Sequence, residues 1–416
     1  MRTMKNPKLL SLAAAVLLFA CSDESPNGTT DATDRDVDVA SDTDVDGSAD
    51  GRLDAEADAP LPDVEAGTLE EQLNRGAYKV GSYEMEFIDE TRPTQANGSF
   101  EGADSRTLET IVLYPAQEDE ETPAAGGPFP LLVYSHGFMS NRFDNRGLME
   151  HLTRQGYVVV SADFPLTHRG APGGENVLDI EYQPADVSFL IDSLLSDEDL
   201  PTRGLVDGEN IGAFGVSLGA MTSLMLGYHP EFGDPRIDAV VAAAPPTCFA
   251  PAQMLDSGLP LLLIHGDNDS ILPYGENSEA AYPSAIAPKF FVTINAGNHA
   301  NFPDAGLIME ALPNSDTIGC SAIASNIPVA DMGTLAEAIG GRPAAEVNAQ
   351  CSAPCIDVDS APESISPVIQ HDIFNAGTTA FFNYYLRDDE RGLGFLVYEF
   401  EDSFPEDMSL EFDLSE

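Results

Sequence analysis

Residues 215–219 read Gly-Val-Ser-Leu-Gly, which places a serine between two glycines at the spacing Gly-x-Ser-x-Gly. An apolar run, residues 210–214, precedes them, and a helix-forming run, residues 220–228, follows them. A serine at a sharp turn from strand to helix exposes its hydroxyl above the sheet, and the two glycines leave room for that turn. We therefore predict that Ser217 is a nucleophile. The N–H of Leu218 would face the negative charge that forms on an attacked carbonyl oxygen.

A serine hydroxyl becomes a strong nucleophile only when a neighbouring base removes its proton, so a histidine is needed beside Ser217. His299 is the predicted base, because it follows the apolar run 289–294 in a loop of small residues. His371, at the start of the last predicted helix, is the alternative base. His265 ends a buried apolar run, and we expect it to pack or to hydrogen-bond locally.

An acid behind the histidine fixes the tautomer of the imidazole and stabilises its protonated form. Residues 266–273 follow an apolar strand-forming run and hold two carboxylates in one turn. Asp269 is the predicted acid, and Asp267 is the alternative. The nucleophile then comes first along the chain, the acid second and the histidine third, which is the order expected when the serine sits on a strand–turn–helix elbow.

The oxyanion that forms during acyl transfer needs two convergent N–H donors. The second donor is predicted in residues 135–139, which follow an apolar run ending at Tyr134. Gly137 permits a close turn there, and the N–H of Phe138 is the expected partner of the Leu218 N–H. We also expect an apolar pocket for the acyl group next to the serine. Its expected lining residues are Phe138, Met139 and Leu218, with either Pro245 and Pro246 or Phe302 as further candidates, and any of them could instead belong to the core.

The elements that must hold these residues alternate along the chain. Short continuous apolar runs are typical of strands buried on both faces of a parallel sheet, and helical patterns separate them. We expect an α/β fold with a mostly parallel central sheet, right-handed crossovers and helices on both faces. The predicted strands are residues 78–87, 106–114, 129–134, 157–162, 210–214, 237–243, 259–264 and 289–294, and the predicted helices are residues 145–155, 184–195, 220–228 and 368–386.

Five short motifs carry a resemblance to a known superfamily. They are Ser135-His136-Gly137-Phe138, Pro184-Ala185-Asp186-Val187, Gly215-Val216-Ser217-Leu218-Gly219, His265-Gly266-Asp267-Asn268-Asp269 and Gly297-Asn298-His299. Over residues 81–386 the chain resembles α/β hydrolases, most of all the platelet-activating-factor acetylhydrolase-like and dienelactone-hydrolase-like esterases and, more distantly, the cutinase-like polyester hydrolases. The resemblance implies the α/β-hydrolase fold, a triad of Ser217, Asp269 and His299, and an oxyanion hole made by the backbones of Phe138 and Leu218.

Acidic residues dominate the charge of the chain. Its 70 Asp and Glu outnumber its 19 Lys and Arg, which gives a net charge of −51 and argues against nucleic acid as a partner. Residues 22–69 are rich in Asp and poor in large apolar side chains, so they cannot bury enough surface to fold. We expect residues 21–75 to be a disordered tether, residues 76–400 to form the catalytic domain and residues 401–416 to be an acidic C-terminal tail.

The N-terminus has the layout of an export signal. Basic residues precede an apolar stretch, residues 9–19, which is too short to span a bilayer. Residues 1–20 are therefore predicted to be a signal peptide. The end of this segment resembles a bacterial lipobox, which implies acylation of Cys21 and anchoring in a lipid bilayer. We expect the outer membrane of a Gram-negative bacterium, and an ordinary secretory signal cut near the same place is the alternative.

Four further cysteines, Cys248, Cys320, Cys351 and Cys355, are an even number in an exported chain. They predict two disulfides in one of three pairings. Cys351 and Cys355 also have the spacing of half a metal site, but no second pair of ligands completes it, so neither a metal nor another cofactor is predicted. Residues 304–367 hold all but Cys248 and are expected to be an insertion before the last helix that walls or covers the pocket.

These expectations indicate a serine carboxylic-ester hydrolase of the esterase or lipase type, with a small or lipid-like ester as its substrate. Ser217 would form an acyl-enzyme, and water activated by His299 would hydrolyse it. Two alternatives stay open. One is a catalytically silent hydrolase fold that serves as a binding module, and the other is a peptidase or acyltransferase with the same triad. The sequence predicts no oligomeric state.

Overall fold

The computed structural model describes residues 61–74, 76–251, 254–323, 332–341, 343–355 and 358–415. The predicted signal peptide, residues 1–20, the lipidation residue Cys21 and most of the tether lie outside these ranges, so those expectations stay predictions. Every helix among the described residues is either too short or too polar to span a lipid bilayer.

One sheet forms the centre of the folded unit, and within the described residues it has nine strands in the order β1-β2-β4-β3-β5-β6-β7-β8-β9. The six strands from β4 to β8 in this order run parallel, while β1, β2 and β9 pair antiparallel at the two edges. The strands are β1 (Lys79–Asp89), β2 (Arg106–Ala116), β3 (Phe129–Ser135), β4 (Val158–Asp163), β5 (Val206–Val216), β6 (Ile237–Ala243), β7 (Leu261–Gly266), β8 (Lys289–Ile294) and β9 (Met408–Asp413).

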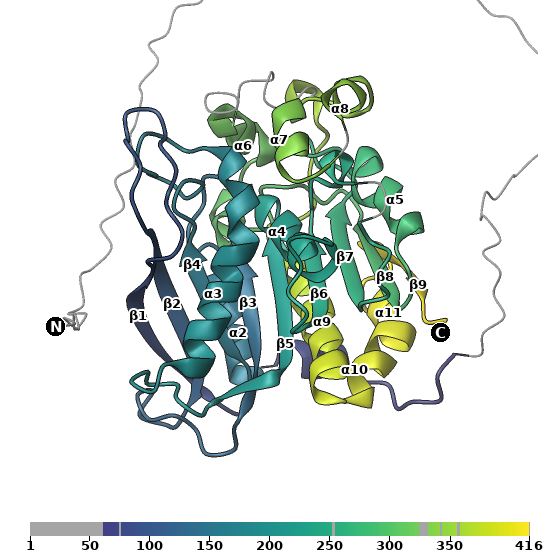
Figure 1. Cartoon of the computed structure of the whole chain (residues 1–416). Helices are drawn as coiled ribbons and strands as arrows, with labels where there is room; N and C mark the ends of the chain where they lie inside the picture. The colour runs from purple at the N-terminus through teal and green to yellow at the C-terminus, as the bar shows by residue number, and fades with distance from the viewer. Residues whose placement is uncertain are drawn as a thin grey trace, which may run out of the picture. The chain divides into compact units, whose positions relative to one another are not determined.

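Helices cover both faces of this sheet, so each strand of its centre is buried on two sides (Figure 1). Helices α2 (Arg146–Gln155) and α9 (Pro367–Arg387) pack on one face with one hydrophobic core, and α3 (Gln183–Ser196) and α4 (Leu218–Tyr228) pack on the other face with a second core. This is the α/β-hydrolase fold that the sequence predicts. The shorter helices are α1 (Leu69–Leu73), α5 (Ser278–Ala281), α6 (Asp316–Ile323), α7 (Met332–Ala338), α8 (Ala344–Gln350), α10 (Glu390–Gly394) and α11 (Phe400–Ser403).

Both ends of the folded unit extend beyond the expected domain. Helix α1 lies inside the range expected to be tether, where Thr68 and Glu71 form a capping box and Glu71 pairs with Arg391. Residues 401–416, the expected acidic tail, are part of the folded unit over most of their length, because they hold most of α11 and all of β9. In β9, apolar residues alternate with polar ones, and Phe412 stacks on Phe290 of β8 with ring centroids 5.8 Å apart.

The segment between the histidine loop and α9 forms helices α6, α7 and α8, which gather at the top of the view in Figure 1. Two disulfides hold it. Cys248, after β6, pairs with Cys351, and Cys320 on α6 pairs with Cys355. The prediction of two disulfides is therefore confirmed, and the pairing that the sequence left open is settled. The alternative of a metal site at Cys351 and Cys355 is wrong, because both sulfur atoms are bonded to sulfur.

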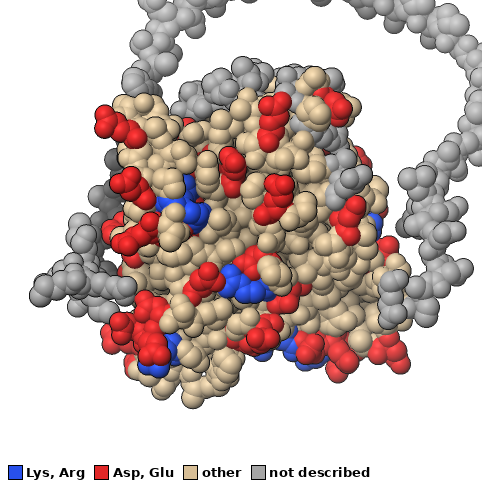
Figure 2. Space-filling model, viewed as in Figure 1, with Lys and Arg blue, Asp and Glu red and all other residues tan. Residues whose placement is uncertain are grey.

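Acidic side chains are distributed over the face of the folded unit seen in Figure 2, with basic side chains in small groups among them. The basic groups are largely paired. Arg236, for example, lies 2.6 Å from a carboxylate oxygen of Asp192 and 2.6 Å from one of Asp234. The negative charge of the chain is therefore not confined to the predicted tether.

A fully buried arginine fastens α3 to the edge of the sheet. The Arg106 side chain on β2 donates hydrogen bonds of 2.6–3.0 Å to both oxygens of Asp186 on α3 and to both oxygens of Asp179. All three side chains are inaccessible to solvent. Removing charges from water is costly, and the paired geometry offsets this cost only while every partner is present.

Replacement of Arg106 by methionine would leave the buried carboxylate of Asp179 without a cation and that of Asp186 with Arg92 alone, 2.9 Å away. We expect Arg106→Met to lower the free energy of unfolding by about 3–5 kcal/mol, measured by urea denaturation. As a control, Arg203→Met removes an exposed pair with Glu198 and should change it by less than about 1 kcal/mol. Equally small losses in the two variants would contradict a structural role for the buried pair.

Candidate active site

Ser217 occupies the tight turn between β5 and α4. Its φ of 59° and ψ of −123° are a strained conformation for a residue with a side chain. Neighbouring backbone leaves no space at the two flanking glycines: a Cβ on Gly219 would lie 1.9 Å from the Ser135 carbonyl oxygen, and one on Gly215 would lie 2.4 Å from the Gly219 oxygen. The Gly-x-Ser-x-Gly spacing is therefore a steric requirement of this turn.

The two predicted oxyanion donors, the N–H groups of Phe138 and Leu218, belong to residues next to Ser217. A Cβ on Gly137 would come within 3.4 Å of the Ser217 Cβ, which shows how closely this loop approaches the serine. The N–H of Phe138, the next residue, makes no hydrogen bond to any other described residue. Leu218 begins α4, so its N–H lies in the first turn, where a helix offers no acceptor. Both residues line the same cavity as Ser217.

A buried histidine holds the Gly137 turn in place. His136 Nε2 accepts a hydrogen bond from the Phe164 N–H at 3.2 Å, so Nδ1 carries the proton and donates to the Gly137 carbonyl at 2.7 Å. Burial lowers the pKa of His136 to about 4, which keeps this ring neutral at ordinary pH. The sequence motif contains His136, but reasoning from the sequence gave it no role.

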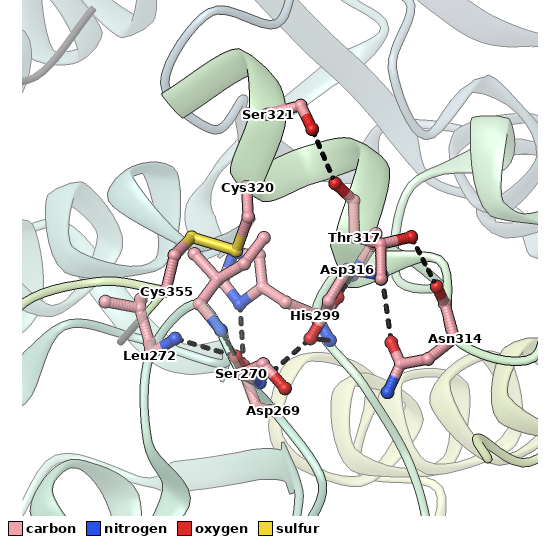
Figure 3. The surroundings of a disulfide bond; sticks show 12 residues. Asp269, Ser270, Leu272, His299, Asn314, Asp316, Thr317, Cys320, Ser321 and Cys355 are labelled. Carbon is pink, nitrogen blue, oxygen red and sulfur yellow. Dashed lines mark hydrogen bonds and ion pairs between the residues drawn. A yellow bond between two sulfur atoms is a disulfide. The ribbon is translucent and has the colours of Figure 1, made fainter. Parts of the chain in front are cut away.

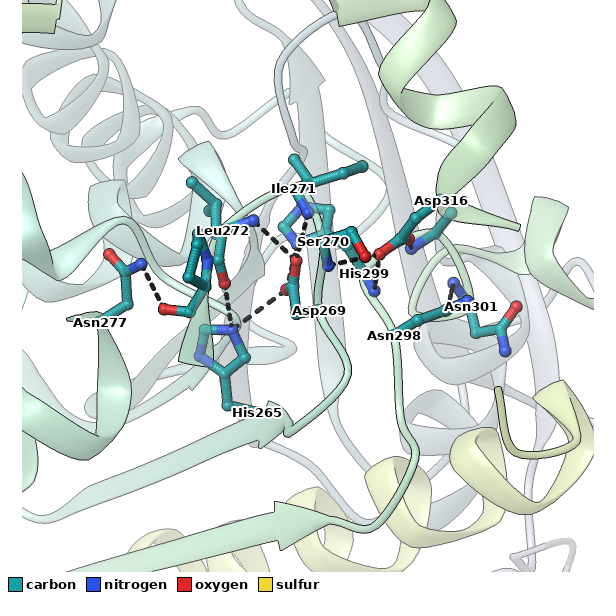
Figure 4. Close-up of polar contacts among 12 residues, drawn as sticks. His265, Asp269, Ser270, Ile271, Leu272, Asn277, Asn298, His299, Asn301 and Asp316 are labelled. Atoms are coloured by element: carbon teal, nitrogen blue, oxygen red, sulfur yellow. Dashed lines mark hydrogen bonds and ion pairs between the residues drawn. The ribbon is translucent and has the colours of Figure 1, made fainter. Parts of the chain in front are cut away.

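The structure brings Asp269 and His299 into direct contact. Asp269 Oδ2 lies 2.6 Å from His299 Nδ1, and Asp269 Oδ1 accepts hydrogen bonds from the Ile271 and Leu272 N–H groups at 2.9 and 2.7 Å (Figure 4). Burial by itself would raise the pKa of Asp269, but the charge and hydrogen bonds of the two neighbouring histidines outweigh it and hold the pKa below its usual range. Burial would lower the pKa of His299, and the charge of Asp269 more than reverses this, so that the pKa is raised.

His265 is the second histidine on the same carboxylate. Its Nε2 lies 3.1 Å from Asp269 Oδ2 and 3.0 Å from the Leu272 carbonyl oxygen, while Nδ1 lies 2.7 Å from the Ser278 hydroxyl. A proton on Nε2 serves both acceptors, and Nδ1 then accepts from Ser278. The sequence predicted local hydrogen bonding for His265, and its bond to the predicted acid was not foreseen.

Asp267, the alternative acid, and His371, the alternative base, make contacts away from Ser217. Asp267 is exposed, and its Oδ1 accepts a hydrogen bond from the Ala296 N–H at 2.6 Å, so it fastens one turn to the next. His371 on α9 contacts the Pro303 carbonyl oxygen at 3.3 Å. His299 lines the cavity at Ser217 and His371 does not, while Asp269, and not Asp267, contacts His299. The geometry favours Asp269 and His299 over both.

A cavity of about 500 Å³ opens at Ser217 and His299. In the described part of the chain, no hydrogen bond joins these two side chains, and such bonds often tighten only when substrate binds. Most of the lining is apolar, as expected, but two of the expected residues, Pro245 and Phe302, are not part of it. Phe302 packs against Phe374 with ring centroids 5.6 Å apart. The apolar lining includes Phe138, Met139, Leu218, Pro246, Phe249 and Leu272, together with Met309, Ile318, Ile323 and Leu335 from the insertion.

Comparison with solved structures finds a ferulic acid esterase from Streptomyces cinnamoneus with a TM-score of 0.53 and 21% sequence identity, covering 76% of this chain and 93% of that one. No family model and no curated protein sequence matches the chain. At this level of identity the likeness establishes the fold alone, and it confirms the α/β-hydrolase fold.

The contact between His299 and Asp269 predicts a histidine that holds its proton unusually well. We expect His299 to titrate above 6.5, its ordinary value, and Asp269→Asn to lower this pKa by removing the adjacent charge. NMR titration of the imidazole ring protons would measure both values. His371, whose pKa is lowered by burial, is a control in the same spectrum. A His299 signal that titrates below that of His371 would contradict the described geometry.

Proposed function

We propose that this chain is a serine carboxylic-ester hydrolase that acts through an acyl-enzyme. The observation that carries the proposal is that His299, paired with the buried Asp269 at 2.6 Å, lines one cavity with the strained Ser217. A nucleophile on a tight turn, a base within the same cavity and a buried acid behind that base are the parts that such chemistry needs. The name of the structural neighbour, a ferulic acid esterase, supports the same class of reaction.

In the proposed reaction His299 Nε2 takes the proton of Ser217 Oγ while this oxygen attacks the ester carbonyl. The N–H groups of Phe138 and Leu218 hold the resulting oxyanion, and loss of one such donor typically costs about 3–4 kcal/mol in the barrier. His299 returns the proton to the alcohol, which leaves. Water then gives a proton to His299 and attacks the acyl-enzyme. His299 returns this proton to Ser217 Oγ as the bond between Oγ and the acyl carbon breaks, and the carboxylic acid is released. Asp269 keeps the proton of the neutral imidazole on Nδ1 and stabilises the imidazolium.

The cavity supports an ester with an apolar acyl or alcohol part. Aromatic and aliphatic side chains form most of its wall, and a volume of about 500 Å³ lies in the range of pockets for small ligands. Asp144 and Arg169 supply polar groups to the lining. A small or lipid-like ester fits this description better than a polar peptide does.

Two alternative functions are compatible with the same geometry, and experiments can distinguish them from ester hydrolysis. A binding module would hold an apolar ligand in this cavity without turnover, whereas a peptidase or acyltransferase would use the same three side chains on another acyl bond or with another acceptor. We favour ester hydrolysis for two reasons. Ser217, His299 and Asp269 lie together at one site, and the structural neighbour is named as a ferulic acid esterase.

Hydrolysis should depend on the serine at the turn. We expect Ser217→Ala to lower the hydrolysis of p-nitrophenyl esters, tested from acetate to palmitate, by on the order of 10⁴-fold or more, because the nucleophile is lost. A fluorophosphonate probe should label the wild type and not the variant. Ser196→Ala, at the exposed end of α3, is the matched control and should keep full activity. A folded wild type that neither hydrolyses any ester nor reacts with the probe would favour the binding module.

We further propose that the chain is anchored to a bacterial outer membrane through acylated Cys21. The support is the signal-like sequence before Cys21 and the long acidic segment after it. On expression in a Gram-negative host, we expect labelled palmitate to be incorporated and the protein to fractionate with the outer membrane, and Cys21→Ser to lose both. Release of an unlabelled wild-type protein into the periplasm or medium would instead support an ordinary secretory signal.

A further inference from the structure

A third carboxylate lies beside the Asp269–His299 pair and comes from the insertion. Asp316 is the first residue of α6 and is fully buried. Its Oδ1 accepts a hydrogen bond from the Ala300 N–H at 2.7 Å, and its Oδ2 accepts one from the Ser270 N–H at 2.9 Å and a longer one from the His299 N–H at 3.4 Å. One side chain therefore joins the loop after β7 to the loop after β8.

The positions of these contacts are specific. Ser270 directly follows Asp269, and Ala300 directly follows His299, so the carboxylate of Asp316 holds the backbone next to each member of the pair. Figure 4 shows Asp316 and Asp269 on opposite sides of His299. A shift of Asp316 would move the acid and the base relative to each other.

A disulfide fixes Asp316 from the other end of the same helix. Cys320 lies one turn further along α6 and is bonded to Cys355. The N–H of Cys355 donates to the Ser270 carbonyl oxygen at 3.0 Å, while the N–H of Ser270 donates to Asp316. The backbone of Ser270 is thus bound by Cys355 on one side and by Asp316 on the other, and the disulfide, drawn in Figure 3, links Cys355 to the helix that carries Asp316.

The two residues before Asp316 also bind the histidine loop. Asn298 Nδ2 donates to Asn314 Oδ1 at 2.9 Å and to Ser315 Oγ at 3.0 Å, and Ser315 Oγ donates to Asn301 Oδ1 at 2.7 Å. All four side chains are buried. The insertion therefore contacts the histidine loop before, at and after His299.

Asp316 also adds charge next to the imidazole. The titratable groups that act on His299 are Asp269, after β7, and Asp316, on α6, and both raise its pKa against the effect of burial. Burial, followed by the charge of Asp269, raises the pKa of Asp316 to about 6, against the lowering effect of His299 and of the Ala300 and Ser270 N–H groups. Asp316 therefore carries its negative charge above about pH 6.

We propose that Asp316 is a positioning residue for the Ser217–His299–Asp269 machinery, which locks the acid loop to the base loop and holds a second negative charge beside the imidazole. The inference rests on the proposed function. It makes the disulfide-bonded insertion a part of the catalytic apparatus and not only a wall of the cavity.

The pH dependence of kcat/KM in Asp316→Asn tests this role. The amide keeps the size of the side chain, but it removes the charge and turns an NH₂ group toward N–H donors. We expect kcat at about pH 8 to fall by about 10–100-fold, with little change in KM. Because the imidazole loses a negative neighbour, its pKa falls, and the acid limb of the profile should move to lower pH by roughly 0.5–1 unit.

Asp238→Asn is the matched control. Asp238, at the amino end of β6, also accepts a backbone N–H, from Ile211 at 2.8 Å, and burial also raises its pKa. This variant should keep the acid limb of the wild type. A purely structural role for Asp316 would lower activity without moving the limb, so a folded Asp316→Asn with an unmoved limb would overturn the proposal.

NMR titration of the wild-type protein tests the same role without measuring hydrolysis and without requiring that a variant folds. In the wild-type protein the Ala300 and Ser270 amide signals should report the ionisation of Asp316 near pH 6, and the His299 ring signals should show a step at the same pH. Amide and ring signals that titrate independently would also overturn the proposal. Because this test requires no hydrolysis, failure of the proposed esterase activity and failure of the role of Asp316 are distinguishable.

Discussion

The buried carboxylate of Asp269 is the group on which the geometry of the site depends. A buried charge is tolerated only when it is paired and hydrogen-bonded, and Asp269 meets this condition through two N–H groups of its own turn and two imidazoles. The partners come from separate places: His265 from the end of β7, and His299 from the loop after β8. Satisfying one carboxylate therefore requires β7 and β8 to be neighbours, with their carboxyl ends at the same edge of the sheet.

A second constraint, which is steric, operates at the same edge. The carbonyl oxygen of Ser135, at the end of β3, lies where a side chain on Gly219 would have to be. Strands β3 and β5 pair in parallel up to Ser135 and Gly215, so the turn that holds Ser217 is wedged against the loop of Phe138. The parallel pairing of these two strands thus brings the loop of Phe138 close to the turn that holds Ser217.

Local patterns predicted the fold and three side chains of the site, because each of these signals lies within a few consecutive residues. The apolar runs fix the strands, and the elbow, the acid turn and the histidine loop directly follow strands. Features that depend on distant contacts could not be predicted in this way. Asp316 lies 46 residues from Ser270 in the sequence, and Cys248 lies 103 residues from Cys351. Strand β9 was not predicted because its segment is acidic, although apolar and polar residues alternate along it.

The position of the insertion explains why its cross-links are where they are. The proposed base, His299, lies on a loop, and such a base needs rigid support because small displacements of reacting groups are costly. This loop is held by α6 as well as by the sheet. Helix α6 is short, and short helices are marginal without further contacts. The disulfide between Cys320 and Cys355 lowers the conformational entropy of the unfolded insertion. The disulfide between Cys248 and Cys351 links the insertion to the loop after β6. The insertion has little hydrophobic core of its own, so the disulfides stabilise its folded conformation. The hydrogen bonds of Asp316 then hold the loops of Asp269 and His299, the proposed acid and base, against this stabilised segment.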